Sequence, residues 1–248
     1  MRDAYLEALG IDRWVARAAS SAPVAVEPAA AGAHEVPVAA DSGDALQRVA
    51  RGAEPAPVVY TDWGVLRERV AACTACDLCK TRTQTVFGVG DTRADWLVIG
   101  EAPGAEEDRQ GEPFVGRAGQ LLNAMLLAIG LPRETVFIAN ILKCRPPGNR
   151  DPKPEEVSRC LPFLSAQIAL LKPKMILAVG RIAAQNLLAT DAPLARLRGK
   201  LHHFGEAHTP LVITYHPAYL LRTPSDKRKA WEDLKFARAT YQRLAGSN

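Results

Sequence analysis

The sequence predicts a three-layer α/β protein, in which helices cover both faces of a central four-stranded, mainly parallel sheet. Two observations predict this fold class. Short hydrophobic runs alternate with helical patterns from residue 62 onward, and each run is hydrophobic at successive positions rather than at every second one. Continuous runs of this kind are typical of parallel strands that are buried on both faces.

The predicted elements follow one another in a regular order. Asp62 is a favoured N-cap residue and precedes the first predicted helix. Glycines stand where the first strand and the second helix are expected to end. The predicted strands occupy residues 95–100, 135–140, 174–180 and 210–216, and the predicted helices occupy residues 63–72, 118–130, 154–171, 181–189 and 225–244.

The first 60 residues differ from the remainder. Residues 20–60 are rich in Ala and Pro and have few large side chains, which predicts a flexible linker. Residues 1–19 hold a compact apolar pattern that predicts a short amphipathic docking peptide. The folded domain is therefore expected at residues 61–248.

Composition excludes several classes of protein. The 248 residues are 48% hydrophobic and 23% charged, which excludes a collagen, a fully disordered chain and a mini-protein. No apolar run approaches the roughly 18 residues of a membrane span, and the N-terminus carries charges where a secretory signal would be apolar. We therefore expect a cytoplasmic protein, in which five Cys residues indicate a metal, a cluster or catalysis rather than disulfides.

Charge is unevenly distributed along the chain. Residues 1–60 hold 5 of the 31 basic and 8 of the 27 acidic residues, which leaves 26 basic and 19 acidic residues, a net charge of +7, for the remainder. This excess fits nucleic acid as an anionic partner, and it fits an ordinary solvated surface equally well.

Polar loops rich in Gly or Pro follow the predicted strands. Glu101, Asn140 and His216 each lie at the last residue of a strand or just beyond it. The carboxyl ends of parallel strands meet at one edge of a sheet, where ligands bind in open α/β folds. We expect these three residues to belong to one site.

Four cysteines have a spacing that suits a Cys₄ site. Cys73 and Cys76 form a C-x-x-C pair, Cys144 follows the second strand, and Cys160 lies on the next helix. These ligands fit either zinc or a [4Fe–4S] cluster, and spacing alone makes zinc at least as good a choice. Cys79 adds a third local thiol, which is either a bystander or a competing ligand.

Four ordered motifs, GEAPGAEED, GEPFVGRAGQLLN, NILKCRPPGNR and HPAYLLR, together resemble those of the iron–sulfur uracil-DNA glycosylases, family 4 of their superfamily. The resemblance runs from about residue 61 to the C-terminal helix. It implies a base-excision-repair enzyme that flips uracil out of DNA and hydrolyses its N-glycosidic bond. It also implies a structural [4Fe–4S] cluster on the ligands Cys73, Cys76, Cys144 and Cys160.

The resemblance implies roles for the residues that recognise uracil. Phe114 is expected to stack on the base, and Asn140 to pair with its N3–H and O4. Gly100 and Ala102 are expected beside the base. His216 is expected to donate a hydrogen bond to O2 as negative charge develops there.

A carboxylate is expected to stabilise the oxocarbenium-like sugar. Related monofunctional enzymes hold an Asp at the position of Ala102, which cannot act, so the resemblance transfers the role to Glu101. Glu107 and Asp108 are reserve candidates, with loop capping or water binding as their alternative role.

DNA contacts are expected along the same edge of the sheet. Leu220 and Leu221 are predicted in an exposed loop, as a wedge that fills the gap left by the flipped base. Tucking of either leucine into the core is the alternative. Phosphate contacts are expected from Gly180, Arg181, Lys143, Arg145 and Arg222, with Lys227 and Arg228 extending the edge.

Two rival functions remain open at this point. One is a non-catalytic, zinc-containing α/β nucleic-acid-binding module, although the chain has neither a complete Walker sequence nor a G-x-G-x-x-G. The other is a relative that becomes covalently trapped on the abasic sugar through a basic loop with a His. Here that loop reads KCRPPGNRDPK and contains no His, so turnover is expected.

The segment YLEALGIDRWVAR at residues 5–17 is similar to the N-terminal peptide of the psi subunit of the bacterial clamp loader. The similarity implies a contact with the clamp loader or replisome, with the linker raising the local concentration of the enzyme. An unrelated short helix that packs on its own domain is the alternative.

Overall fold

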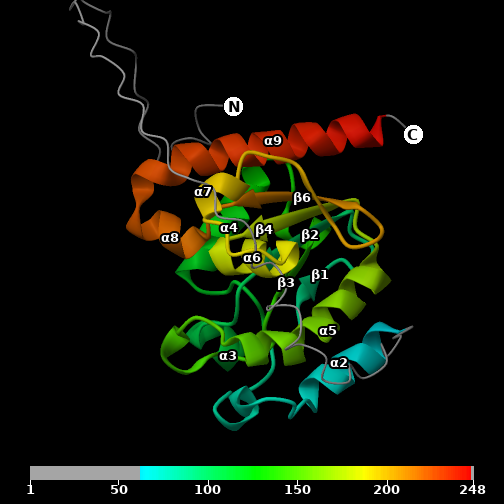
Figure 1. The fold of residues 1–248 in the computed structure, drawn as a ribbon, viewed down its shortest axis with the longest axis vertical. Helices are drawn as coiled ribbons and strands as arrows, with labels where there is room; N and C mark the ends of the chain where they lie inside the picture. The colour runs from blue at the N-terminus through cyan, green and yellow to red at the C-terminus, as the bar shows by residue number, and fades with distance from the viewer. Residues whose placement is uncertain (1–61, 247–248) are drawn as a thin grey trace, which may run out of the picture. The chain divides into compact units, whose positions relative to one another are not determined.

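The computed structural model describes residues 62–246, so the expected docking peptide at 1–19 and the expected linker at 20–60 lie outside the described residues. Figure 1 shows a central sheet with helices around it. The strands are β1 (Val89–Gly90), β2 (Trp96–Gly100), β3 (Phe137–Asn140), β4 (Met175–Val179), β5 (His202–Phe204) and β6 (Thr209–Thr214). The α-helices are α2 (Trp63–Ala71), α3 (Ala105–Gln110), α4 (Arg117–Ala128), α5 (Pro154–Leu171), α6 (Arg181–Leu188), α7 (Leu194–Leu197), α8 (Pro217–Arg222) and α9 (Lys227–Ala245). Short 3-10 turns are η1 (Asp77–Lys80), η2 (Arg133–Thr135), η3 (Pro147–Asn149) and η4 (Pro224–Asp226).

The sheet has the strand order β1-β3-β2-β4-β6-β5. Its four central strands are parallel, with Val98 of β2 opposite Ile138 of β3 and Leu177 of β4. These are the four predicted strands, so the predicted parallel sheet is confirmed. β1 and β5 add short antiparallel edges, and the sequence analysis missed them because two or three residues are too few to show a hydrophobic pattern.

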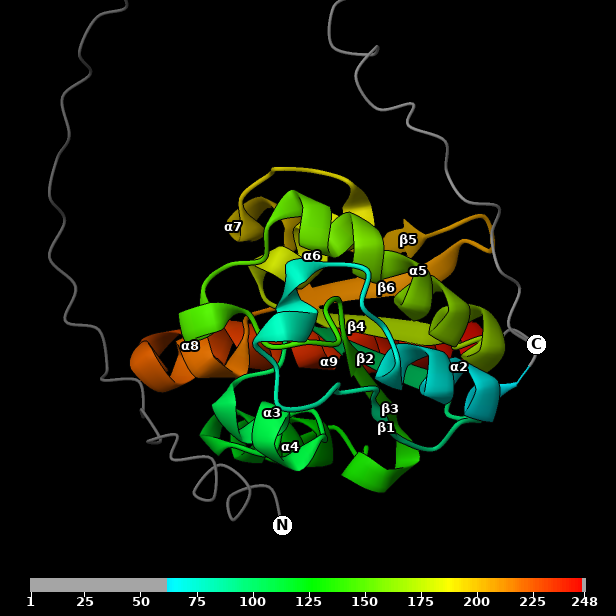
Figure 2. The same ribbon diagram turned by 90° about the horizontal axis from the view of Figure 1, so that it is seen from below.

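Alternate strand residues face two separate core clusters. Leu97 and Ile99 pack with residues of α2, α5 and α6, whereas Trp96 and Val98 pack with residues of α4, α8 and α9. Figure 2 shows α5 and α6 on one side of the sheet and α4 on the other. Burial of both faces explains why each central strand contains a run of successive hydrophobic residues, and it confirms the three-layer α/β arrangement.

Local signals place most helices as expected. Asp62 caps α2, because its Oδ1 accepts hydrogen bonds from the N–H groups of Gly64 at 2.7 Å and Val65 at 3.0 Å. The prediction of an exposed loop after β6 is wrong. Pro217 begins the helix α8, and its fixed φ suits the first position of a helix. Within residues 62–246, no helix has the length and apolar character needed to cross a membrane.

Candidate functional site

Three predicted site residues meet at the carboxyl ends of β2 and β3. Asn140 ends β3 and is only 2% exposed, and its Oδ1 has no hydrogen-bond partner within the described range. A Cβ at Gly100, the last residue of β2, would overlap both Asn140 Oδ1 and the Phe114 ring. The absence of a side chain at Gly100 therefore allows the Asn140 amide and the Phe114 ring to pack directly against the end of β2.

The backbone of Phe114 has a conformation that non-glycine residues rarely adopt, with φ at 55°. Neighbouring groups hold it there. Arg133 donates to the carbonyl oxygens of Pro113 at 2.6 Å and Phe114 at 3.4 Å, and also to Glu112 at 2.9 Å. A Cβ at Gly119 would overlap the Phe114 carbonyl. The ring is thus fixed by its own loop before any ligand binds.

Glu107 organises the same loop. Its Oε1 accepts hydrogen bonds from the N–H groups of Val115 at 3.1 Å and Gly116 at 3.2 Å, while its Oε2 accepts from Gly104 at 3.1 Å. The carboxylate therefore ties both ends of the segment that carries Phe114, in agreement with the loop-capping alternative.

Asp108 also has a structural role in this arrangement. It is 4% exposed, and its carboxylate accepts the N–H of Thr83 at 2.9 Å. Thr83 follows the cysteine-rich segment, so Asp108 joins that segment to α3.

His216 lies beside Phe114, with ring centroids 5.6 Å apart and planes inclined by 30°. Its Nδ1 accepts the N–H of Ala218 at 3.1 Å, so in the neutral ring the proton resides on Nε2. Burial lowers the pKa of His216 to about 4, with a further contribution from Arg222. The imidazole is therefore neutral at physiological pH and keeps an Nε2–H available for donation.

Glu101 follows β2 directly, and its carbonyl oxygen accepts the N–H of Leu142 at 3.0 Å. Burial raises the pKa of its carboxyl to about 7; the negative charge of Asp151 adds to the rise and Arg181 opposes it. Arg181 in turn pairs with Asp151 at 2.6 Å. An acidic group with this pKa exchanges its proton within the physiological range.

The remaining predicted residues at this edge fall into two groups. Leu221 and Arg222 are exposed on α8, Arg181 is exposed at the start of α6, and Arg145 is partly buried and donates to Asn149 at 2.7 Å. Gly180 closely approaches His216, because a Cβ there would lie 2.9 Å from the His216 Cβ. Ala102 packs against the core cluster of α2 and α5.

Two predicted DNA contacts are wrong. Lys143 is 1% exposed, and its Nζ donates to the Asn140 carbonyl oxygen at 2.8 Å and to Gln167 Oε1 at 2.7 Å, so it cannot reach a phosphate. Leu220 is 1% exposed and belongs to the core cluster of α4 and α9. On helix α8, neighbouring residues point in different directions, which leaves Leu221 as the exposed leucine.

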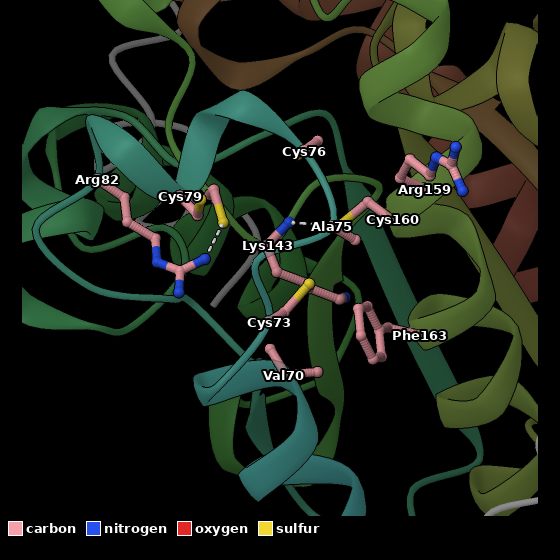
Figure 3. A pocket seen from close by; sticks show the side chains of 11 residues that line it. Val70, Cys73, Ala75, Cys76, Cys79, Arg82, Lys143, Arg159, Cys160 and Phe163 are labelled. Carbon is pink, nitrogen blue, oxygen red and sulfur yellow. Dashed lines mark hydrogen bonds between the residues drawn. The ribbon is translucent and has the colours of Figure 1, made fainter.

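The five cysteines all line one cavity between α2, η1 and α5 (Figure 3). Arg82 donates to Cys144 Sγ at 3.1 Å, and the Lys143 N–H donates to Cys160 Sγ at 3.2 Å. The other lining residues are Val70, Ala75, Arg82, Lys143, Arg159 and Phe163. The lining has thiols and cationic side chains but no carboxylate, which suits a group that carries net negative charge once four thiolates bind it.

Sequence reasoning missed Arg133, Asp151 and the true role of Lys143. Arg133 precedes β3, and nothing in its neighbourhood in the sequence indicates that it holds a loop 20 residues away. Asp151 lies in the loop KCRPPGNRDPK, just after a motif, and nothing in that loop indicates its role. Their significance depends on contacts between distant segments.

Comparisons with known proteins agree with this geometry. The family model described as Uracil DNA glycosylase superfamily matches residues 87–235. The chain is 44% identical over 177 residues to the type-4 uracil-DNA glycosylase of Archaeoglobus fulgidus, covering 69% of this chain and 88% of that protein. It is 43% identical over 175 residues to the enzyme of the same type from Pyrobaculum aerophilum, covering 68% and 89%. The type-4 enzyme of Thermotoga maritima is 41% identical over 179 residues, covering 71% and 92%. The chain therefore belongs to the uracil-DNA glycosylase superfamily and, within it, to the type-4 enzymes.

Proposed function

We propose that this protein is a uracil-DNA glycosylase of base-excision repair, which hydrolyses the N-glycosidic bond of uracil in DNA and leaves an abasic site. The unpaired, buried Oδ1 of Asn140 beside the Phe114 ring is the observation that carries the proposal. A buried amide oxygen without a partner is costly, and a ligand that supplies an N–H removes the cost.

Uracil fits this requirement. Asn140 Oδ1 accepts from N3–H of the base, and Nδ2 donates to O4. Cytosine offers the opposite pattern, with an acceptor at N3 and a donor at N4, so the same amide rejects it. The Phe114 ring supplies a stacking surface for a base that has left the duplex.

The chemical step breaks the bond between N1 of uracil and C1′ of the sugar. The bonding electrons leave with uracil and are delocalised from N1 onto O2 and, through the conjugated C5=C6 bond, onto O4. His216 donates its Nε2–H to O2 and thereby stabilises the leaving anion, in the manner of an oxyanion hole. Nδ1 accepts the Ala218 N–H, so the neutral imidazole carries its proton on Nε2. Nε2 is the atom that this step requires as a donor.

The sugar acquires positive charge as the bond breaks. Glu101 offsets this charge when it is ionised and positions the water that attacks C1′. The water oxygen forms the new bond to C1′, and its proton passes to the carboxylate or to solvent. Desolvation of Glu101 strengthens its electrostatic interaction with the sugar.

The exposed residues at this edge fit contacts with DNA. Leu221 is the candidate wedge, and the candidate phosphate contacts are Arg222, Arg181, Arg145 and the backbone at Gly180. Lys227 and Arg228 lie next to them at the start of α9. In this arrangement, phosphates compete with Asp151 for Arg181.

We further propose that Cys73, Cys76, Cys144 and Cys160 hold a [4Fe–4S] cluster. Five thiols and three cationic side chains line the cavity. The family to which the chain belongs supports the cluster rather than zinc as the group that these thiols bind. Such a cluster would crosslink the segment before the sheet, the loop after β3 and α5. The reduced thiols that it needs fit a cytoplasmic enzyme.

Release of uracil tests the function. The wild-type protein is incubated with single-stranded and double-stranded DNA that contains one uracil, and alkaline cleavage then reports abasic sites. DNA with cytosine or thymine at the same position is the control, and Asn140→Ala is the variant that should lose release. Absence of cleavage by the wild type would favour the zinc-containing binding module. An adduct that survives denaturing electrophoresis would favour a trapping relative.

For residues 5–17 we propose a contact with the clamp loader or replisome, on the ground of sequence similarity alone. A protein that lacks residues 1–20 should excise uracil normally in isolation and should bind clamp-loader proteins more weakly. Equal binding by the truncated and the full-length protein would remove this proposal.

A further inference from the structure

One buried lysine, Lys143, connects the thiol cavity to the backbone of Asn140, the residue whose side chain is proposed to recognise uracil. Its backbone N–H donates to Cys160 Sγ at 3.2 Å, and its side-chain Nζ donates to the Asn140 carbonyl oxygen at 2.8 Å. Gln167 of α5 accepts a second hydrogen bond from Nζ at 2.7 Å. Figure 3 shows the lysine beside Cys160 at the wall of the thiol cavity. Neither the catalytic step nor the ligand set uses the Lys143 side chain.

The end of β3 explains why Asn140 needs this partner. The carbonyl and the N–H of one trans peptide group point in opposite directions. The N–H of Ile141 donates to Gly100 on β2 at 3.0 Å, so the carbonyl of Asn140 faces the other side. On that side β1 pairs with β3 only at Phe137 and Ile138. Asn140 therefore lies beyond the reach of β1, and Lys143 Nζ takes the place of a strand neighbour.

Gln167 fixes the lysine in turn. It is fully buried, and its Nε2 donates to the Phe87 carbonyl oxygen at 2.8 Å while its Oε1 accepts from Lys143. The backbone of Lys143 is held as well, because its carbonyl oxygen accepts the N–H of Val86 at 2.8 Å. Lys143 thus has fixed contacts at both its backbone and its side chain.

A buried lysine is expensive to maintain. Lys143 is 1% exposed, and no carboxylate within residues 62–246 hydrogen-bonds to it or forms an ion pair with it. Among residues 62–246, the hydrogen-bond partners of Nζ are the neutral oxygens of Asn140 and Gln167. An apolar side chain of the same size would avoid the cost of burying a cation but could not donate to the Asn140 carbonyl oxygen.

We propose that Lys143 is a positioning residue for uracil recognition: through its Nζ, supported by Gln167, it holds the backbone of Asn140 so that the amide meets the flipped base in a fixed orientation. This inference rests on the proposed function. An amide that is free to tilt would lose the paired hydrogen bonds to N3–H and O4, while contacts with the DNA backbone would be unaffected.

The test uses Lys143→Met, which keeps most of the apolar length of the side chain and removes the donor. We expect the affinity for free uracil and the kcat/KM for uracil excision to fall by at least about tenfold, the effect of losing roughly one well-placed hydrogen bond to a buried group. Binding to DNA with an abasic-site analogue should stay at the wild-type level, as should the iron content. Lys200→Met is the control, because Lys200 is exposed and remote from β3.

A second pair of variants keeps the proposal testable if Lys143→Met fails to fold. Gln167→Met removes the acceptor that fixes Nζ and should weaken uracil binding, whereas Gln167→Glu keeps an acceptor oxygen and should weaken it less. The double variant Lys143→Met/Gln167→Met should bind uracil no worse than Lys143→Met, since the two side chains act together.

Wild-type uracil affinity and wild-type kcat/KM in folded Lys143→Met would overturn the proposal. Equal losses of uracil binding and abasic-DNA binding would also overturn it, because they would indicate general damage to the fold. A wild-type enzyme that releases no uracil from DNA would instead refute the proposed function, so the two failures are distinguishable.

Discussion

The carboxylate of Glu107 accepts the backbone N–H of Val115, the residue after Phe114, at 3.1 Å. The same oxygen, Oε1, also accepts the backbone N–H of Gly116, and the second oxygen, Oε2, accepts the backbone N–H of Gly104. One side chain therefore closes the loop that presents the aromatic ring, although its own chemistry is not used on the substrate.

Glu107→Ala should leave three N–H groups without this acceptor and lower the free energy of unfolding by about 1–3 kcal/mol. It should also weaken uracil binding, because the strained backbone of Phe114 loses its support. Urea unfolding and free-uracil titration measure the two effects. Glu106→Ala is the control, since Glu106 is exposed and pairs with Arg109 and Gln110 on its own helix. Similar losses in both variants would contradict the prediction.

The rate of uracil excision should depend on the ionisation of Glu101. Its pKa is about 7, so the carboxylate is neutral below that pH and cannot offset the charge of the sugar. The single-turnover rate should rise with pH through a midpoint near 7 and level off about one pH unit above it, whereas Glu101→Gln should be slow and should lack this rise.

The charge of Asp151 raises the pKa of Glu101, so Asp151→Asn should move the midpoint of the pH profile to lower pH. Glu206→Gln removes one negative charge at an exposed position between β5 and β6 and should leave the midpoint unchanged. Identical midpoints for all three proteins would contradict the influence of Asp151 on Glu101, and a Glu101→Gln protein that keeps the rise with pH would assign the titration to another group.

His216 should be neutral and carry its proton on Nε2 throughout the physiological range. Its pKa is lowered to about 4, and the Ala218 N–H occupies Nδ1. Nitrogen NMR of the ring should show no titration between about pH 5 and 8, the range in which an unperturbed histidine changes charge. A ring that titrates within this range, or a proton on Nδ1, would contradict the assigned donor.

The two leucines of α8 should behave differently. Leu220→Ala should create a cavity in the core and lower the free energy of unfolding by about 2–5 kcal/mol. Leu221→Ala should change stability by less than about 0.5 kcal/mol. It should reduce excision from double-stranded DNA more than from single-stranded DNA, because only a duplex leaves a gap in its stack. Full activity of Leu221→Ala on duplex DNA would exclude the wedge.

Four of the five cysteines should bind the cluster, and Cys79 should not. Cys160→Ser should abolish the visible absorption of a [4Fe–4S] cluster, lower the iron content and destabilise the link between α5 and the loop after β3. Cys79→Ser should keep the absorption and the iron, although Cys79 lines the same cavity. A wild-type protein that contains zinc and no iron would refute the cluster.

The sequence by itself determined the fold class and the positions of the predicted site residues at the ends of the strands. Each central strand contains a run of successive hydrophobic residues because both of its faces are buried, and this pattern is visible without coordinates. The same pattern places Asn140 at the end of a strand and Glu101 and His216 just beyond strand ends. In open α/β sheets, ligands bind at this edge. Capping by Asp62 and the start of α6 after Gly180 depend on near neighbours, so they too could be predicted.

Only the tertiary structure decided what surrounds these residues. Lys143 was assigned to phosphates because it is charged, yet three-dimensional packing places it against Asn140 and Gln167. Leu220 and Leu221 are adjacent in sequence, and only the helix around them separates a core residue from an exposed one. The role of Arg133 depends on segments that are brought together by folding. Periodicity and capping arise from neighbouring residues and can be predicted locally, whereas burial and side-chain partners depend on contacts between segments distant in the chain.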